Sequence, residues 1–211
     1  EPVCAGSAGS PGICVACTPE DDALCTGTTP VCENNTCVAC TSNAQCDSQV
    51  CLDAESGGSG ACAPATSVYF VATGGNDSGN CQDSAAPCET LDHVIGVVDV
   101  PVAYIHASGR LEGPVALFAD NSSDYVVIGA TRDQTATVFV PTRNDESTVE
   151  LSNGVNVTFR HVTISGEGSV AQDTIQLNNS NVDLVLIRST VRNASLRGIF
   201  SSNGGTVTVS G

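Results

Sequence analysis

The chain has 211 residues, with 23 acidic residues against seven basic ones and a formal net charge of −16. All seven basic residues are arginines and the first is Arg110, so the chain lacks the basic clusters that bind nucleic acids or anionic membrane surfaces. No apolar run approaches the ~18 residues of a spanning helix, so we expect no membrane insertion.

The first 63 residues are rich in cysteine and contain no aromatic residue. Such a segment cannot offset the entropy of folding with an apolar core, so covalent cross-links must hold it. We therefore predict a disulfide-stapled module over residues 1–63, in an oxidising extracellular or cell-surface location. Its ten cysteines are Cys4, Cys14, Cys17, Cys25, Cys32, Cys37, Cys40, Cys46, Cys51 and Cys62.

These cysteines recur in units of four, because Cys-Val-Ala-Cys-Thr occurs at residues 14–18 and again at 37–41. One unit runs from Cys17 to Cys37 and the next from Cys40 to Cys62. Cys4 and Cys14 form the back half of an earlier unit and are a plausible pair, so we expect the natural protein to extend further at its N-terminus. Within one unit, three disulfide connectivities stay open.

The same spacing has a second interpretation. Cys14-x-x-Cys17 and Cys37-x-x-Cys40 match a four-thiolate zinc site. The other cysteines interleave with this motif at the repeat spacing, and duplication explains both pairs, so we favour disulfides.

After a short linker at residues 64–67, the pattern changes to strands. A β-type run covers residues 68–72, and Cys81 and Cys88 enclose a small loop that predicts another disulfide. One amphipathic helix follows, because apolar residues stand at positions i, i+3, i+4 and i+7 from Leu91 to Val98, after the N-cap residue Thr90.

Short strands between polar turns fill the remainder. We predict them at residues 102–107, 115–118, 125–128, 137–140, 147–151, 155–159, 162–164, 174–177, 182–187, 198–200 and 206–209.

A repeat decides how these strands stack. Residues 157–166 are echoed by 184–193, and 205–211 begin a third copy, at the spacing of one turn of a solenoid. In such a coil two arginines, Arg160 and Arg188, should point outward or lie in turns. The residues expected to point inward are Val157, Phe159, Ile164, Leu184, Leu186, Val191, Val207 and Val209.

Residues 68–211 resemble secreted right-handed parallel β-helix proteins of the pectate-lyase-like superfamily. The resemblance is carried by Tyr69-Phe70-Val71, Gly74-Gly75-Asn76-Asp77, Pro87-x-x-Thr90-Leu91 and the coil at residues 156–166. It implies a mainly β fold, namely a right-handed parallel β-helix with one short N-terminal capping helix, preceded here by the disulfide-rich module. Gly211 would then fall in mid-coil, so we expect further coils or another chain to cover that end.

The cysteine units resemble short repeats in surface proteins of myxobacterium-like bacteria, which implies a bacterial surface location.

Relatives with the β-helix fold cleave acidic polysaccharides, which gives weak catalytic candidates. An outward arginine acts as base in such lyases, and acidic residues hold Ca²⁺ or transfer protons. The corresponding residues would be Arg160 and Arg188 as bases, with Glu150, Glu167, Asp173 and Asp183 as ligands or acids. The other interpretation, solvated turn charges, is the one that we favour.

Acidic loops offer candidate Ca²⁺ ligands at Asp77, Asp83, Asp120 and Asp124, although none follows a known calcium motif. We expect no other cofactor.

Three functions remain open. The first is a non-catalytic extracellular module with a structural or adhesive role, which contacts glycans or other surface proteins. The second is a polysaccharide lyase or glycosidase with a groove on the β-helix. The third is a filament subunit that stacks on copies of itself through the open solenoid end.

Overall fold

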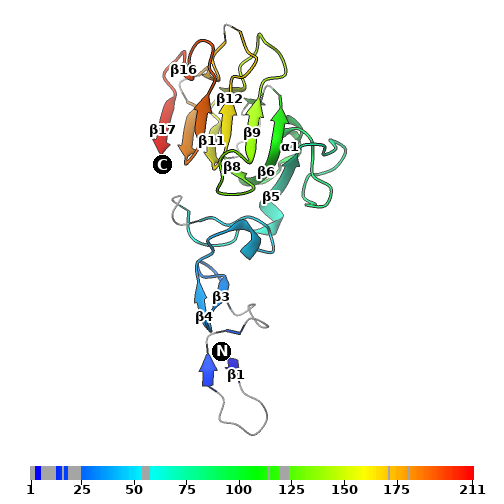
Figure 1. The fold of residues 1–211 in the computed structure, drawn as a ribbon, viewed down its shortest axis with the longest axis vertical. Helices are drawn as coiled ribbons and strands as arrows, with labels where there is room; N and C mark the ends of the chain where they lie inside the picture. The colour runs from blue at the N-terminus through cyan, green and yellow to red at the C-terminus, as the bar shows by residue number, and fades with distance from the viewer. Residues whose placement is uncertain are drawn as a thin grey trace. The chain divides into compact units, whose positions relative to one another are not determined.

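A computed structural model describes residues 3–5, 13–15, 17–18, 25–53, 58–113, 115–118, 124–170, 172–179 and 181–211; for 3–5, 13–15 and 118 it describes the backbone alone. The chain divides into two compact units, Glu1–Ala65 and Thr66–Gly211 (Figure 1). Within the described residues, no helix has the length and apolar character that crossing a membrane requires.

The first unit contains two antiparallel strand pairs. β1 (Val3–Ala5) pairs with β2 (Ile13–Val15), and β3 (Val31–Glu33) pairs with β4 (Thr36–Val38). A 3₁₀ turn, η2 (Asn43–Gln45), follows β4, and another, η4 (Ala65–Ser67), covers the boundary between the two units. These elements are short because nothing large and apolar is available to bury.

Disulfides hold the first unit, as predicted from its composition. The two complete units of four cysteines have the same connectivity, first to third and second to fourth. The bonds are Cys17–Cys32, Cys25–Cys37, Cys40–Cys51 and Cys46–Cys62. In each unit the third and fourth cysteines face each other across an antiparallel pair, yet each bonds to a cysteine further upstream.

The backbone places Cys4 opposite Cys14 in the same way. The side chains of Cys4 and Cys14 lie outside the described part of the structure, so the disulfide expected between them stays a prediction. Cys17, Cys37 and Cys40 are all oxidised, so they are not thiolate ligands for the zinc site considered as the alternative.

The second unit begins with β5 (Val68–Ala72), which pairs in parallel with the long strand β6 (Val102–Glu112). Between them lie the disulfide Cys81–Cys88 and α1 (Leu91–Val97). The helix confirms the amphipathic pattern: Thr90 caps it by accepting a hydrogen bond from the His93 backbone N–H, and Leu91 and Val94 are buried.

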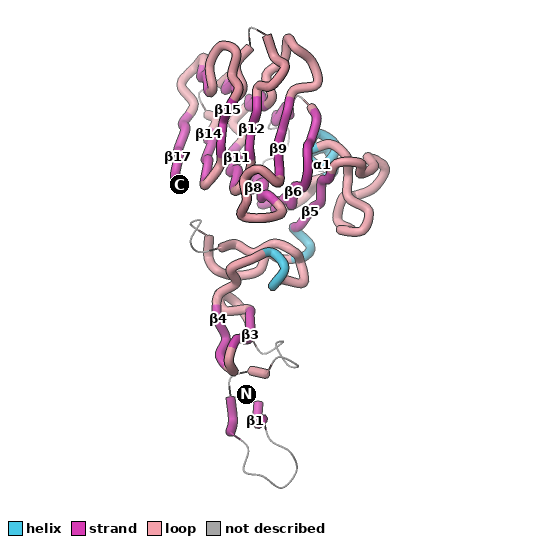
Figure 2. The backbone as a smooth tube through the Cα atoms, viewed as in Figure 1, coloured by secondary structure: helices cyan, strands magenta, loops and turns pink. Residues whose placement is uncertain are grey.

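From there the strands recur in threes, as the repeat predicts (Figures 1 and 2). Each triplet adds one strand to each of three parallel ladders, β7–β10–β13–β16, β8–β11–β14–β17 and β9–β12–β15. β6 is long enough to pair with both β8 and β9. The bounds are β7 (Val115–Phe118), β8 (Asp124–Gly129), β9 (Thr137–Val140), β10 (Val149–Ser152), β11 (Asn156–Arg160), β12 (Thr163–Ser165), β13 (Ile175–Leu177), β14 (Asp183–Ile187), β15 (Thr190–Arg192), β16 (Ile199–Ser201) and β17 (Thr206–Ser210).

The core consists of rows of like residues stacked in register. One row is Val115, Val149 and Ile175, and similar rows run through the other ladders. Across the interior, Phe139 and Phe159 meet edge to face at 5.9 Å. The second unit is therefore mainly β, with parallel sheets around one apolar interior.

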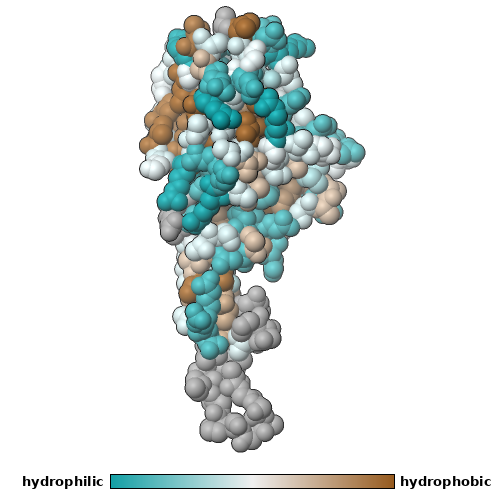
Figure 3. All heavy atoms as spheres, viewed as in Figure 1, coloured by the Kyte–Doolittle hydropathy of each residue, from teal (hydrophilic) through white to brown (hydrophobic). Residues whose placement is uncertain are grey.

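The inward set differs from expectation at β17. Val207 and Val209 continue the rows of Leu184 and Leu186, yet they are 37% and 66% exposed. β17 pairs with β14 on one side, and the side chains of Val207 and Val209 lack the covering layer that the inner strands have. The brown edge of the second unit in Figure 3 lies on the side that carries β17.

Candidate functional site

The outer face of the sheet β7–β10–β13–β16 carries a row of partly exposed side chains, two of them polar. Strand register places Ala116, Glu150, Gln176 and Phe200 side by side, one from each strand. Alternation along each strand sends these residues outward while their neighbours fill the core. We call this surface, together with Asp173 and Arg197 at its edge, the polar face.

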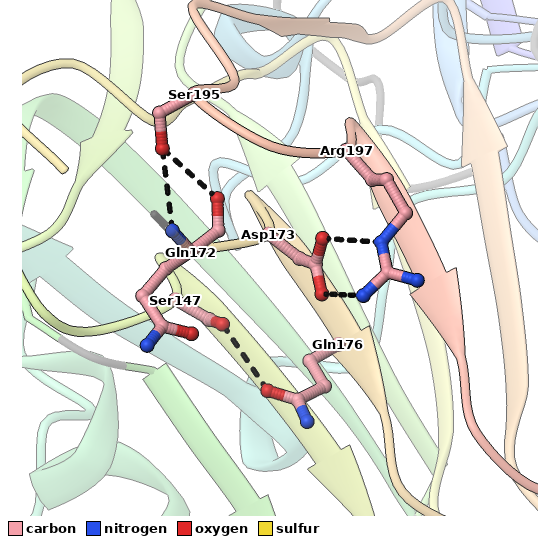
Figure 4. Close-up of polar contacts among 6 residues, drawn as sticks. All are labelled: Ser147, Gln172, Asp173, Gln176, Ser195 and Arg197. Carbon is pink, nitrogen blue, oxygen red and sulfur yellow. Dashed lines mark hydrogen bonds and ion pairs between the residues drawn. The ribbon is translucent and has the colours of Figure 1, made fainter. Parts of the chain in front are cut away.

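An ion pair stands at the edge of the polar face (Figure 4). The Nε and Nη2 atoms of Arg197 donate to the two carboxylate oxygens of Asp173 at 2.8 and 3.0 Å. The side chain of Asp173 is only 6% exposed, whereas that of Arg197 is 47% exposed. The Arg197 guanidinium also lies 3.4 Å from the ring centroid of Phe200. Arg197 thus joins neighbouring coils through its ion pair with Asp173, and it stacks on Phe200 of its own coil.

Hydrogen bonds between coils order the rest of this surface. Ser147 donates to the Gln176 side-chain oxygen at 3.3 Å, and Asn178 donates to Glu150. At the edge, the Ser195 hydroxyl accepts from the backbone N–H of Gln172 and donates to its carbonyl, both at 3.2 Å (Figure 4). The face is thereby pre-organised rather than a set of independent mobile side chains.

The structure separates the catalytic candidates. Glu150 and Asp173 belong to the polar face, but Arg160 ends β11 in a different ladder and Arg188 directly follows β14. Arg188 lies in a turn with φ 45°, and His161 occupies the equivalent turn position with φ 55°. Arg160 and Arg188 therefore lie at another ladder than the one that carries the polar face.

The remaining acidic candidates are used locally. Glu167 pairs with Arg110 at 3.4 Å, with both side chains about half exposed. Asp124 accepts from the Asn156 amide at 2.8 Å, and Asp183 is the next residue in that row, exposed at the start of β14.

Asp77 and Asp83 both accept backbone hydrogen bonds in the segment between β5 and α1. Asp83 accepts from the backbone N–H of Ala85 at 2.8 Å. Asp77 accepts from Glu89 and twice from Thr90, at the start of α1. Burial would raise the pKa of Asp77, but these hydrogen bonds outweigh it and hold the pKa below its ordinary value. The fourth calcium candidate, Asp120, lies outside the described residues.

A small pocket of about 240 Å³ lies where α1 approaches β6 and β7. Its lining consists of Thr90, Leu91, Asp92, Glu112, Gly113, Val115 and Thr142. Asp92 Oδ1 accepts from the backbone N–H of Ala116 at 3.2 Å, which connects the pocket with the first strand of the polar face. Desolvation raises the pKa of Asp92; the hydrogen bond from Ala116 opposes this rise and the nearby charge of Asp77 adds to it.

Sequence reasoning missed Arg197 and the pocket. Asp173 and Arg197 each stand two residues before their strands, so register alone brings them together. Arg197 could have been identified from the sequence because it precedes its strand by the same number of residues as Asp173. This comparison requires the first residues of β13 and β16 to be predicted within one residue.

A comparison with known protein families finds a match at the N-terminal part of the chain. A family of unknown function, DUF8331, matches residues 1–68. Neither the curated proteins nor the solved structures contain a match to the chain.

Proposed function

We propose that this protein is a non-catalytic extracellular module with a structural or adhesive role, which contacts an extended glycan through the polar face. The observation that carries the proposal is the register of Glu150, Gln176 and Phe200 on consecutive strands. A carboxylate and an amide can bond sugar hydroxyls as acceptor and donor, and an aromatic ring can pack against a sugar's apolar face.

The proposal includes a right-handed parallel β-helix for the second unit. Its support is that each triplet of strands extends all three ladders by one parallel strand. Parallel crossovers of this kind are right-handed in nearly all proteins. The strands of a ladder lie about 4.8 Å apart, close to the length of one sugar unit in an extended chain, so successive units would meet successive strands.

Extracellular placement is supported by the disulfides. Five are described, and bonds of this kind persist in oxidising compartments. The high negative charge of the chain favours solubility and disfavours anionic polymers.

A binding role is favoured over hydrolysis because only one of the two carboxylates on the polar face, Glu150, keeps an oxygen available to a ligand. Glycosidases need one carboxyl group that carries a proton and one that acts as base or nucleophile. Both oxygens of Asp173 accept from Arg197, and Glu150 accepts from Asn178. Asp173 therefore has no oxygen left for a substrate, and Glu150 lacks a second carboxylate on the polar face that could complete such a pair.

The test is a screen of the protein on a glycan array, with and without Ca²⁺, combined with an assay for newly formed sugar ends. We expect binding without cleavage. Gln176→Ala should weaken binding about fivefold, the cost of one typical hydrogen bond. The matched control is Thr158→Ala, which changes an outward residue of β11 in another ladder and should have no effect.

Release of sugar ends would overturn the non-catalytic assignment. Equal losses for Gln176→Ala and Thr158→Ala would remove the polar face as the contact surface. Failure to bind any glycan would refute glycan contact as a whole.

A further inference from the structure

Two asparagine–glycine steps stand in turns that lead from the ladder β7–β10–β13–β16 to the ladder β8–β11–β14–β17. They are Asn153–Gly154, between β10 and β11, and Asn203–Gly204, between β16 and β17, and the sequence contains no other such pair. Asparagine before glycine is prone to lose its side-chain amide group, because the glycine nitrogen has no neighbouring Cβ to hinder its approach to the amide carbon. The two steps therefore have the same intrinsic chemistry, and their surroundings decide whether they react.

The inner step, Asn153–Gly154, is covered by the next coil. The side-chain amides of Asn153 and Asn179 are in contact, with 2.9 Å between Asn153 Oδ1 and Asn179 Nδ2. A Cβ on Gly154 would lie 3.6 Å from the backbone oxygen of Asn181. Attack on the amide carbon of Asn153 therefore requires this turn to open and to leave its contacts with the next coil.

The outer step, Asn203–Gly204, has open surroundings. Both residues are exposed, and a Cβ on Gly204 would meet no atom within 4 Å. The Gly204 N–H donates to Ser201 Oγ at 3.2 Å, and the Asn203 amide donates to the Asn178 carbonyl at 2.8 Å. These are surface hydrogen bonds outside the strand ladders, so the turn can rearrange while β16 and β17 stay paired.

We propose that Asn203 is a site of spontaneous modification, where water replaces the side-chain amide group, while Asn153 stays intact in the folded protein. The Gly204 backbone nitrogen gives up its proton and bonds to Asn203 Cγ. The bond between Cγ and Nδ2 breaks, and ammonia leaves with that proton. Water then opens the resulting cyclic imide at either carbonyl, which yields aspartate or isoaspartate. This inference does not depend on the proposed function.

The modification changes the turn that leads into β17. The Asn203 amide donates to the Asn178 carbonyl, whereas a carboxylate at position 203 is only an acceptor and would face that carbonyl oxygen. Isoaspartate also adds an atom to the backbone path before Thr206, the first residue of β17. We therefore expect the modified chain to hold β17 less firmly against β14.

The test is mass spectrometry of the whole chain after incubation at mildly alkaline pH in water enriched in the heavy isotope of oxygen. Cleavage after Arg197 gives the peptide 198–211, in which Asn203 is the only residue with a side-chain amide. Asn153 falls in the peptide 144–160, where fragmentation locates any change. We expect uptake of heavy oxygen at Asn203 to be at least about tenfold faster than at Asn153, which corresponds to an opening free energy of ~1.4 kcal/mol for the inner turn.

Two controls separate sequence from structure. In urea both steps lose their surroundings, so Asn153 and Asn203 should react at similar rates. Asn179→Ala removes the contact on Asn153 and should speed the reaction there while the rate at Asn203 stays unchanged.

Two variants at position 203 test the site and its consequence. Asn203→Gln should leave the peptide 198–211 unmodified, because the longer side chain forms the cyclic imide far more slowly. Amide hydrogen exchange in β17 should be faster in Asn203→Asp than in Asn203→Gln, which keeps an amide donor.

Four results would overturn the proposal or one of its steps. Equal rates at Asn153 and Asn203 in the folded chain, or no effect of Asn179→Ala, would show that the neighbouring coil does not protect the inner step. A peptide 198–211 that changes in urea but not in the folded chain would show that the folded turn protects Asn203. A mass change without heavy oxygen would refute the cyclic imide route. Equal hydrogen exchange in the two variants at position 203 would refute the expected loosening of β17.

Discussion

Arg197 and Asp173 allow a direct test of how neighbouring coils are held together. We predict that Arg197→Ala lowers the free energy of unfolding of the second unit by about 2 kcal/mol. The change leaves the Asp173 carboxylate, 6% exposed, without its counter-ion and without two hydrogen bonds. A completely buried pair would cost about 3–5 kcal/mol, but the Arg197 side chain is 47% exposed, so water recovers part of the loss.

Tyrosine fluorescence during urea unfolding is the assay. The chain has no tryptophan, and its three tyrosines, Tyr69, Tyr104 and Tyr125, all lie in the second unit, so the signal reports on that unit alone. A double-mutant cycle with Asp173→Asn should give a coupling energy of about 1–2 kcal/mol. Arg143→Ala is the control, because Arg143 is 74% exposed in its pair with Glu146 and should contribute less than about 0.5 kcal/mol.

Two results would refute this reasoning. If Arg197→Ala and Arg143→Ala cost the same, burial of Asp173 does not determine the strength of the pair. If the effects of Arg197→Ala and Asp173→Asn simply add, the two residues do not stabilise each other.

Three further predictions concern the core, pH and the disulfides. Leu186→Ala should cost about 2–5 kcal/mol in urea unfolding, whereas Val209→Ala, in the same row but 66% exposed, should cost far less; equal losses would contradict the inward packing. Burial lowers the pKa of His106, so the folded state takes up a proton less readily than the unfolded chain. The free energy of unfolding should therefore fall as the pH drops below 6.5, the ordinary pKa of histidine. Melting temperatures measured across this pH range should depend less on pH in His106→Gln than in the unchanged protein. Mild reduction should make the first unit sensitive to proteolysis while tyrosine fluorescence stays native, because Cys81 and Cys88 are buried in the second unit. Simultaneous loss of protease resistance and of native fluorescence would show that the units do not unfold separately.

Much of the fold follows from local patterns. The absence of aromatic residues before Tyr69 required disulfides, and the echo between residues 157–166 and 184–193 required parallel stacking in register. The connectivity within each cysteine unit did not follow, because facing cysteines such as Cys32 and Cys37 bond elsewhere. That choice depends on how the loops cross, and no local propensity encodes it.

The end of β6 shows another limit of sequence reasoning. The predicted strand covers residues 102–107, but β6 continues to Glu112. Gly109 has φ 80°, and a Cβ there would lie 2.4 Å from the Thr73 hydroxyl oxygen. The glycine is therefore a corner within the strand, which lets β6 leave β8 and pair with β9.

The sequence indicated only part of the candidate site. Glu150 and Asp173 could be named from their position near strands, but their partners could not. Asn178 and Arg197 belong to the next coil, 28 and 24 residues away in sequence, and contact depends on register. The pocket at α1 brings residues together from separate segments of the second unit, so periodicity within any one segment could not indicate it.

The repeated disulfide connectivity has a mechanical consequence. A stretched chain from Cys17 to Cys62 would reach ~150 Å if all residues could extend, but the shortest covalent path runs through two of the bonds and limits it to ~60 Å. Under tension the two bonds therefore keep most of the contour length of this segment from extending. Reduction of the disulfides would allow the chain between the bonded cysteines to extend. The redox state of the surroundings therefore sets how far this part of the molecule can be extended.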